Sequence, residues 1–417
     1  MQRSNGSLTI HAGRVLDGTG AAAATDVVVR IERSRIVSVG PASNAPPADG
    51  QVLDFSNATL LPGLIDCHTH TNMPGDGRRG EDVHLADDDA IRLLRSAHNV
   101  GRALETGVTT VCDCGGWNQT TFRLKDGLQQ GVVHGSRVLA SGRPITVSGG
   151  HCWFMGSEAD GVDGVRHAAR QLIKEGADFL KVMATGGSTL GSDPFRPQFS
   201  PEELNTISLE GHRRDRKVVA HCRSNEAMRM VVDAEYDAIM HGWFTDQHGA
   251  RVFDEHLAAD IAERGICVNP TLQITRSRIP ILQARVDNGT ATEEETTMLD
   301  RMRRGHATTL EQVGKLIEHG VQLMAGSDCG WGVYPFGRFD LELAAMVDAG
   351  LTPAGAIASA TGGNAKALGI DDTVGTVAPG READLLIVDG NPDEQISDVT
   401  RVLAVLKAGR VVVNNAA

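Results

Sequence analysis

Two histidines, separated by one residue, follow the first strongly apolar segment of the sequence. His68 and His70 come just after the stretch 62–66, which has the character of a buried strand. Side chains two positions apart on a strand point to the same side, so both imidazoles are expected to face one space and Cys67 to point outward. Imidazole is a common zinc ligand, and the pair therefore indicates a metal site. The alternative is a pair of unrelated surface or core histidines.

Further polar residues stand at the ends of later apolar runs. Lys181 lies within the apolar stretch 179–183, although a buried lysine without a partner is rare and costly. His221, His241 and Asp328 each end such a run. Taken singly, each could be an ordinary structural side chain, and Lys181 could extend its amine to solvent. Their repetition at run ends favours one common site.

Apolar runs and helix-length amphipathic stretches alternate through the middle of the chain. This alternation predicts a parallel (β/α)8 barrel, because each strand and the helix after it form one repeating unit. Barrel enzymes place their active sites at the carboxyl ends of the strands, which is where the polar residues above fall. The eight apolar runs occupy residues 60–66, 107–112, 136–140, 177–182, 217–220, 238–240, 265–270 and 321–325.

Short strands are predicted at both ends of the chain. There, brief apolar segments are separated by Gly, Asn, Asp and Pro, with no helix-length stretch between them. We therefore expect an α/β protein in which residues 60–368 form the barrel. Residues 1–59 and 369–417 are expected to meet in a small β-sandwich domain beside it.

The composition is that of a globular protein with an acidic balance. Of 417 residues, 53 are acidic and 40 are basic, giving a net charge of −13. This balance, without a long basic run, argues against a nucleic-acid partner. No apolar stretch reaches the length of a membrane helix, and the first residues lack the apolar core of a signal peptide. The odd number of cysteines, 7, favours the reducing cytoplasm over a disulfide framework.

The motifs in combination resemble those of the amidohydrolase superfamily. The resemblance rests on Pro-Gly-Leu-Ile-Asp-Cys-His-Thr-His at 62–70, on Lys181, on the two later histidines and on Gly-Ser-Asp at 326–328. The closing segment 374–385 is similar as well. Within the superfamily the sequence looks most like the imidazolonepropionase-related branch. That branch includes metal-dependent Xaa-Pro dipeptidases, other small carboxypeptidases and amidases that degrade toxins or herbicides.

The resemblance implies a centre of two divalent metal ions, with Zn²⁺ as the expected metal. In the family a lysine reacts with CO₂ to give N6-carboxylysine, which bridges the two ions, and Lys181 takes that place here. The other implied ligands are His68, His70 and Asp328 for the first ion and His221 and His241 for the second. A hydroxide between two such cations is a nucleophile at neutral pH, and Asp328 can pass its proton to the leaving amine.

The resemblance also implies residues that contact the substrate. His151 takes the place of a histidine that faces the substrate carbonyl, although a solvent-exposed loop histidine is an equal alternative. Arg223 stands where the peptidase relatives commonly carry a tyrosine that holds a carboxylate. An arginine there can bind a carboxylate or pair with a local acid. Trp331 and Tyr334 lie in a glycine-rich segment, 330–339, that is expected to form a pocket wall or lid.

The sequence therefore predicts a binuclear metal-dependent amidohydrolase that cleaves the C–N bond of a small carboxylate-bearing amide, such as a dipeptide or an N-acyl amino acid. One alternative is an amidase for xenobiotic amides, carbamates or ureas. Another is a mononuclear deaminase or cyclic-amidine hydrolase, but those relatives typically have Glu where this chain has Ser224. Beyond the small-molecule substrate, the expected partner is a further copy of the chain in a homo-oligomer.

Overall fold

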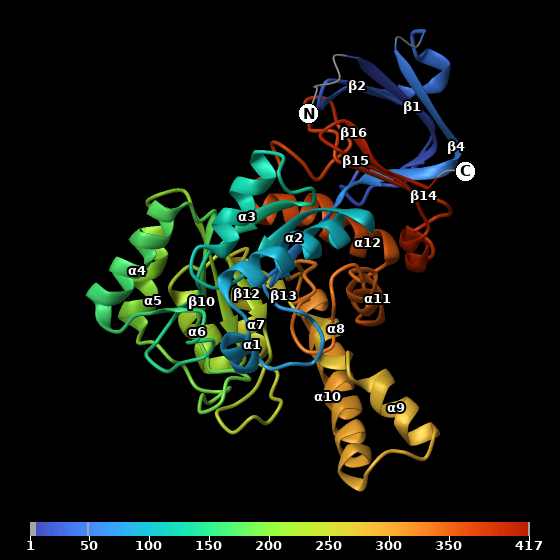
Figure 1. Cartoon of the computed structure of the whole chain (residues 1–417). Helices are drawn as coiled ribbons and strands as arrows, with labels where there is room; N and C mark the ends of the chain where they lie inside the picture. The colour runs from blue at the N-terminus through green and yellow to red at the C-terminus, as the bar shows by residue number, and fades with distance from the viewer. Residues whose placement is uncertain (1–5, 48–49, 416–417) are drawn as a thin grey trace.

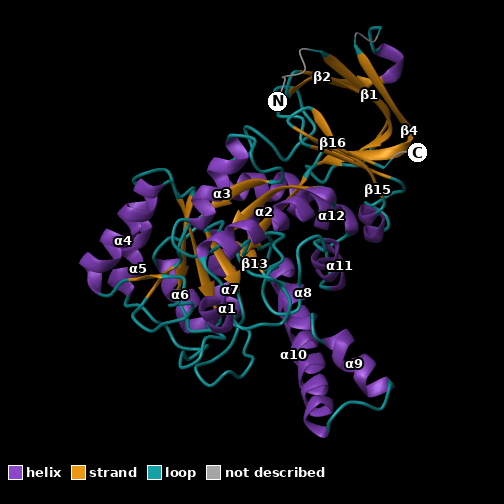
Figure 2. Ribbon diagram, in the orientation of Figure 1, coloured by secondary structure: helices purple, strands orange, loops and turns teal. Residues whose placement is uncertain are grey.

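The computed structural model describes residues 6–47 and 50–415, and it shows a barrel, a curved β-sheet beside it and a projecting helical hairpin (Figure 1, Figure 2). Seven assigned strands contribute to the barrel ring: β5 (Leu64–Thr69), β6 (Val108–Asp113), β7 (Arg137–Ala140), β10 (Phe179–Met183), β11 (Lys217–Cys222), β12 (Ala238–His241) and β13 (Cys267–Asn269). The segment 321–328, together with Cys329, closes the ring, because Leu323 bridges to Val268 and Cys329 bridges to Thr69.

Burial explains why the barrel strands read as apolar runs. Every residue of β6, β10 and β12 is buried, as is usual for parallel strands that are covered on both faces.

The ring continues between β7 and β10. The backbone N–H of Asp178 donates to the carbonyl oxygen of Ala140 at 2.9 Å, and Ile145 of the short β8 (Ile145–Thr146) pairs with Val182. The predicted (β/α)8 barrel is thus confirmed, with β9 (Ser157–Glu158) added beside β8.

The two ends of the chain meet in a single seven-stranded curved sheet. Its strand order is β16-β15-β14-β4-β1-β2-β3, so β4 and β14 join the N-terminal to the C-terminal part. The strands are β1 (Ser7–Val15), β2 (Ala24–Glu32), β3 (Arg35–Pro41), β4 (Gln51–Pro62), β14 (Leu385–Val388), β15 (Val402–Lys407) and β16 (Arg410–Asn414). β4 continues to Pro62, beyond the predicted boundary at residue 59. The division into domains stays a prediction.

The helices begin at residues that suit helix starts. Ser200 forms a capping box with Glu203, and Pro201 follows it at the first helical position. The helices are α1 (Gly80–Ala86), α2 (Asp89–Glu105), α3 (Thr120–Gln129), α4 (Gly161–Glu175), α5 (Pro201–His212), α6 (Asn225–Asp233), α7 (Glu255–Glu263), α8 (Leu272–Arg276), α9 (Ile279–Asp287), α10 (Glu293–Glu318), α11 (Asp340–Asp348), α12 (Pro353–Ala358) and α13 (Asn364–Leu368). Shorter helical turns are Ala42–Asn44, Ser359–Gly363 and Ile396–Thr400.

Two helices leave the compact body of the barrel. α9 and α10 project together as a hairpin, at the opposite end of the molecule from the curved sheet (Figure 1). The base of α10 nevertheless reaches the barrel, where its residues Val313 and Leu316 are buried. Among the described residues, no helix combines the length and the apolarity that a membrane crossing requires.

Candidate active site

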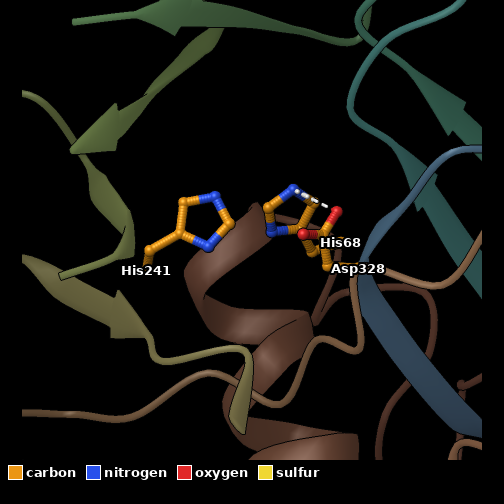
Figure 3. A group of neighbouring side chains, drawn as sticks. All are labelled: His68, His241 and Asp328. Carbon is orange, nitrogen blue, oxygen red and sulfur yellow. Dashed lines mark ion pairs between the residues drawn. The ribbon is translucent and has the colours of Figure 1, made fainter. Parts of the chain in front are cut away.

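Three of the predicted metal ligands converge at the carboxyl ends of the barrel strands. One ligand atom from each of His68, His241 and Asp328 lies within 4.8 Å of the other two, and all three residues are buried (Figure 3). His68 comes from β5 and His241 ends β12, whereas Asp328 ends the segment that closes the ring. Residues far apart in the sequence therefore meet in one place.

The other three predicted ligands surround this group. His70 Nε2 lies 3.3 Å from Asp328 Oδ1, and Lys181 Nζ lies 3.3 Å from His68 Nε2. The His221 ring lies 4.5 Å from the His241 ring, centroid to centroid. All six residues predicted as ligands consequently belong to one connected cluster.

The hydrogen bonds of two histidines indicate which ring nitrogen is available to a metal. His70 Nδ1 lies 3.1 Å from the carbonyl oxygen of Gly115, and His68 Nδ1 lies 2.9 Å from Asn269 Oδ1. Such oxygens only accept, so each Nδ1 must carry the proton and each Nε2 keeps a lone pair. The Asn269 amide is itself fixed, because its nitrogen donates to the carbonyl oxygens of Met324 and Gly326.

His221 is oriented the other way round. Its Nε2 lies 3.1 Å from the carbonyl oxygen of Gly186, so Nε2 carries the proton and Nδ1 keeps the lone pair. The Nδ1 atom of His241 lies 2.7 Å from Thr271 Oγ1, and because a hydroxyl can donate or accept, this contact holds the ring without fixing its tautomer. The donor set of neutral imidazoles and one carboxylate fits divalent transition metals.

The protonation states of the side chains in the cluster also suit metal binding. Burial lowers the pKa of His68 to about 3 and that of His241 well below its usual range, so both imidazoles are neutral at pH 7. Burial opposes ionisation of Asp328, but the neighbouring His68 and His70 lower the pKa of its carboxyl overall. Asp328 is therefore an anion at neutral pH and can serve as a ligand or as a proton acceptor.

The backbone at the site is unusual for residues other than glycine. His241, Thr271 and Asp328 have φ values of 71°, 48° and 57°, in the left-handed region. Such conformations are uncommon for side chains of this size and concentrate at functional sites. Asp66 supports the arrangement, because its carboxylate accepts from the backbone N–H of His68 at 3.2 Å and of Ser327 at 2.9 Å.

The metal-ligand cluster lies in a cavity of about 620 Å³. His151, Arg223 and Trp331 line this cavity together with the six predicted ligands. The His151 side chain is buried rather than solvent-exposed, and its Nδ1 lies 2.8 Å from Thr189 Oγ1. Arg223 is half-buried, and no carboxylate of the described residues lies within 4.0 Å of its guanidinium. The local acid that the sequence left open as its partner is thus not found.

Tyr334 does not line the cavity, which corrects its prediction as a substrate contact. Its ring is buried in the protein core, and its hydroxyl donates to the carbonyl oxygen of Arg338 at 2.8 Å. The phenol is satisfied inside its own loop, so it has no reason to face solvent or substrate. Of the two aromatic residues predicted here, only Trp331 reaches the cavity, where its ring packs edge-on against His70 at 5.4 Å.

Sequence reasoning missed several residues of the site. Trp243 lines the cavity, and Asn269, Thr271 and Thr189 hold the histidines in place. Trp243 stands two positions after His241, as Arg223 stands two positions after His221. The same offset could have identified it. The three residues that hold histidines lie on other segments, and no spacing in the sequence indicates them.

Comparison with known proteins finds a family match, a curated relative and solved structures that are similar over most of the chain. The profile of the Amidohydrolase family matches residues 59–412. The chain is 29% identical to the ochratoxinase of Aspergillus niger over 93% of this chain and 82% of that protein. Among solved structures, a Xaa-Pro dipeptidase with methionine bound in its active site has a TM-score of 0.84 at 25% identity, covering 97% of this chain and 99% of the other. A prolidase complexed with N-methylphosphonate-L-proline has a TM-score of 0.83 at 26% identity, covering 98% and 100%.

Proposed function

Because the chain belongs to the amidohydrolase family and is a hydrolase of carbon–nitrogen bonds, we propose that it cleaves the amide bond of a small substrate that carries a free carboxylate. Dipeptides and N-acyl amino acids are the classes of such substrates that we propose. The observation that carries the proposal is the position of Arg223. It places a guanidinium without an acidic partner in the same cavity as the cluster of metal-ligating side chains.

We propose that two divalent ions, with Zn²⁺ as the expected metal, are held by this cluster. The ligands would be His68, His70 and Asp328 for one ion and His221 and His241 for the other, with Lys181 between them. Bound ions of this kind supply a nucleophile at neutral pH and polarise the carbonyl that is attacked. The arrangement of lone pairs at Nε2 of His68 and His70 and at Nδ1 of His221 supports this assignment.

The surroundings of Lys181 support its carboxylation. Its side chain is 1% exposed, and no carboxylate of the described residues lies within 4.0 Å of its amine. A buried ammonium without an anion is costly. Loss of a proton from the ammonium, attack of the neutral amine on CO₂ and loss of a second proton to solvent would give a carbamate, an anion with two oxygens that can ligate cations.

The remaining roles follow from charge and position. Asp328, an anion at neutral pH, accepts the proton of the attacking water and transfers it to the leaving amine. His151, held at Nδ1 by Thr189, stabilises the negative charge that develops on the carbonyl oxygen. Arg223 binds the substrate carboxylate through charge-assisted hydrogen bonds, which fixes the distance between that group and the scissile amide.

Two alternative functions differ in what they require of the cavity. A xenobiotic amidase would share every ligand, and the 29% identity to an ochratoxinase favours this as the second candidate. A mononuclear deaminase is disfavoured because Ser224 stands where those relatives typically have Glu. The Ser224 hydroxyl caps α6 by accepting from the backbone N–H of Ala227. No acid occupies that position.

The test is a hydrolysis screen of the zinc-loaded protein. The panel contains dipeptides and N-acyl amino acids, each paired with its methyl ester or amide, together with aryl carbamates and ureas. We expect cleavage of the free acids with clear preference over the neutral partners. Preferential cleavage of carbamates, ureas or neutral amides would instead support the xenobiotic amidase. Elemental analysis after addition of bicarbonate and zinc should approach two metal equivalents per chain.

A further inference from the structure

Two guanidinium groups lie over one indole ring at the edge of the cavity. The Cζ atom of Arg223 is 4.6 Å from the centroid of the Trp243 ring, and that of Arg251 is 4.5 Å from the same centroid. Arg223 and Trp243 both line the cavity, whereas Arg251 is not among the residues that line it. Stacking on an indole favours one orientation of a planar guanidinium.

The stack contains two positive charges and no acid. Within residues 6–47 and 50–415, no carboxylate lies within 4.0 Å of either guanidinium. Arg251 instead donates to two neutral oxygens of α10, Gln312 Oε1 at 3.4 Å and Thr309 Oγ1 at 3.3 Å. Burial and the nearby Arg223 lower the pKa of Arg251 to about 10, so the Arg251 guanidinium remains charged at neutral pH. An anion in the cavity would offset this charge.

The backbone around the stack is tied together. The Thr245 hydroxyl donates to the carbonyl oxygen of Arg223, and Thr245 also forms a β-bridge with Arg251. On the other side, Gln312 Nε2 donates to the carbonyl oxygen of Phe244 at 3.0 Å. The loop that carries Trp243 and Arg251 is therefore attached both to the strand end that carries Arg223 and to α10.

We propose that Trp243 and Arg251 are positioning residues that hold the Arg223 guanidinium toward the cavity and so determine the preference for substrates with a free carboxylate. This inference rests on the proposed function of Arg223. Trp243 restricts the rotamers of Arg223, and the like charge of Arg251 disfavours withdrawal of Arg223 from the cavity. The carboxylate of a substrate is then the partner of Arg223, and its negative charge offsets that of the two guanidinium groups.

The experiment compares an acid with its ester in four variants. N-acetyl-L-phenylalanine and its methyl ester serve as substrates for zinc-loaded Arg251→Gln, Trp243→Leu, Arg251→Lys and Arg229→Gln. Arg229 is the matched control, because it pairs with Asp254 and Asp260 on the outside of the barrel. Calorimetric titration with L-phenylalanine and L-phenylalaninamide measures binding without turnover. Metal content and melting temperature are recorded for each variant, and Trp243→Phe replaces Trp243→Leu if that protein does not fold.

We expect Arg251→Gln and Trp243→Leu to raise KM for the acid about five- to thirtyfold. For Arg251→Gln, kcat and the ester reaction should change less than twofold, whereas Trp243→Leu, which alters the cavity wall, should lose clearly more on the acid than on the ester. Arg251→Lys should recover part of the loss because it keeps the charge, and Arg229→Gln should behave as the unchanged protein. Equal losses on acid and ester would show that the stack only supports the fold, which overturns the inference. If Arg223→Met abolishes the preference for the acid while both stack variants keep it, the proposed function stands and the inference is wrong. If the unchanged protein neither cleaves nor binds any carboxylate, the proposed function fails, and the inference fails with it.

Discussion

Replacement of Lys181 by methionine should stabilise the metal-free protein and remove most of the stability that metal adds. The Lys181 side chain is 1% exposed, and its amine has His68 Nε2 as a polar neighbour at 3.3 Å but no carboxylate within 4.0 Å among the described residues. A buried amine of this kind lowers the stability of the metal-free barrel. It is expected where the amine is modified and then ligates metal. The two conditions should therefore give opposite results for one substitution.

The expected magnitude follows from burial. The Lys181 amine has His68 Nε2 as a partner for one of its N–H groups. A buried polar group that lacks its remaining partners costs about 1–3 kcal/mol, and methionine fills a similar volume without the amine. One kcal/mol moves the melting temperature of a 150–250-residue domain by about 2–4 °C, and less in a longer chain. We therefore expect Lys181→Met to melt roughly 1–4 °C higher without metal. With zinc at a hundred times its dissociation constant, each site adds about 2.7 kcal/mol to a protein that binds it.

The assay is differential scanning calorimetry under two conditions. The first uses chelator-treated protein in buffer purged of CO₂, and the second adds zinc and bicarbonate. Lys407→Met is the control, because the Lys407 amine is partly buried but donates to the carbonyl oxygen of Gly135. That control should be less stable in both conditions and should keep the full gain from zinc.

The order of stabilities is the decisive result. Lys181→Met should lie above the unchanged protein without metal and below it with zinc and bicarbonate. An equal gain from zinc in both proteins would show that Lys181 is not a ligand. A metal-free variant that melts several degrees lower than the unchanged protein would show that the amine is well satisfied where it lies, and the reasoning would be refuted.

Three further substitutions test the site and the fold. Arg223→Met should lower kcat/KM at least tenfold for an N-acyl amino acid but less than twofold for its methyl ester, since one charge-assisted hydrogen bond contributes about 1.5–3 kcal/mol; steady-state kinetics on both substrates measure this. Asp328→Asn should lower kcat by about 10²–10⁴-fold, and a near-normal rate at full metal content would assign the proton transfer to another group. Glu342→Gln should flatten the pH dependence of stability measured by urea unfolding. Burial raises the pKa of Glu342 from 4.5 to about 8, so between these values the folded chain keeps a proton that the unfolded chain releases. Glu342 should consequently lower the free energy of unfolding by up to about 1.4 kcal/mol per pH unit as the pH rises from 5 to 8, and a slope that Glu342→Gln leaves unchanged would assign it to other groups, such as Asp66, whose pKa burial raises to about 7.

The barrel could be predicted from the sequence because its strands are buried on both faces. The alternation of side chains along a single strand predicted less well which way each side chain points. Cys67 was expected to point outward, but it packs with Cys112 and Cys114 in a cluster drawn largely from the barrel strands. The pairing of β5 with β6 shifts between Asp66 and Thr69, and this irregularity breaks the two-residue period at that point.

The apolar pattern of the sequence also could not locate the junction between the curved sheet and the barrel. The predicted first run, 60–66, contains the end of β4 and the beginning of β5, because the chain passes from the curved sheet into the barrel at Gly63. A Cβ atom at Gly63 would lie 2.2 Å from Thr109 Oγ1, so the close passage of backbone and side chain depends on glycine. Apolar runs continue through such a junction and do not reveal it. The homo-oligomer and the cytoplasmic location stay predictions.

The candidate ligands could be found from strand ends, but the groups that orient them could not. The carbonyl oxygens of Gly115 and Gly186 determine which nitrogen of His70 and His221 carries the proton. Backbone carbonyls do not titrate near neutral pH and are present at every residue, so no residue type in the sequence marks them. They also fix the ring orientations through the fold itself. A metal ion that enters the cavity would therefore meet lone pairs that are already directed, and little of its binding free energy would be spent on ordering side chains.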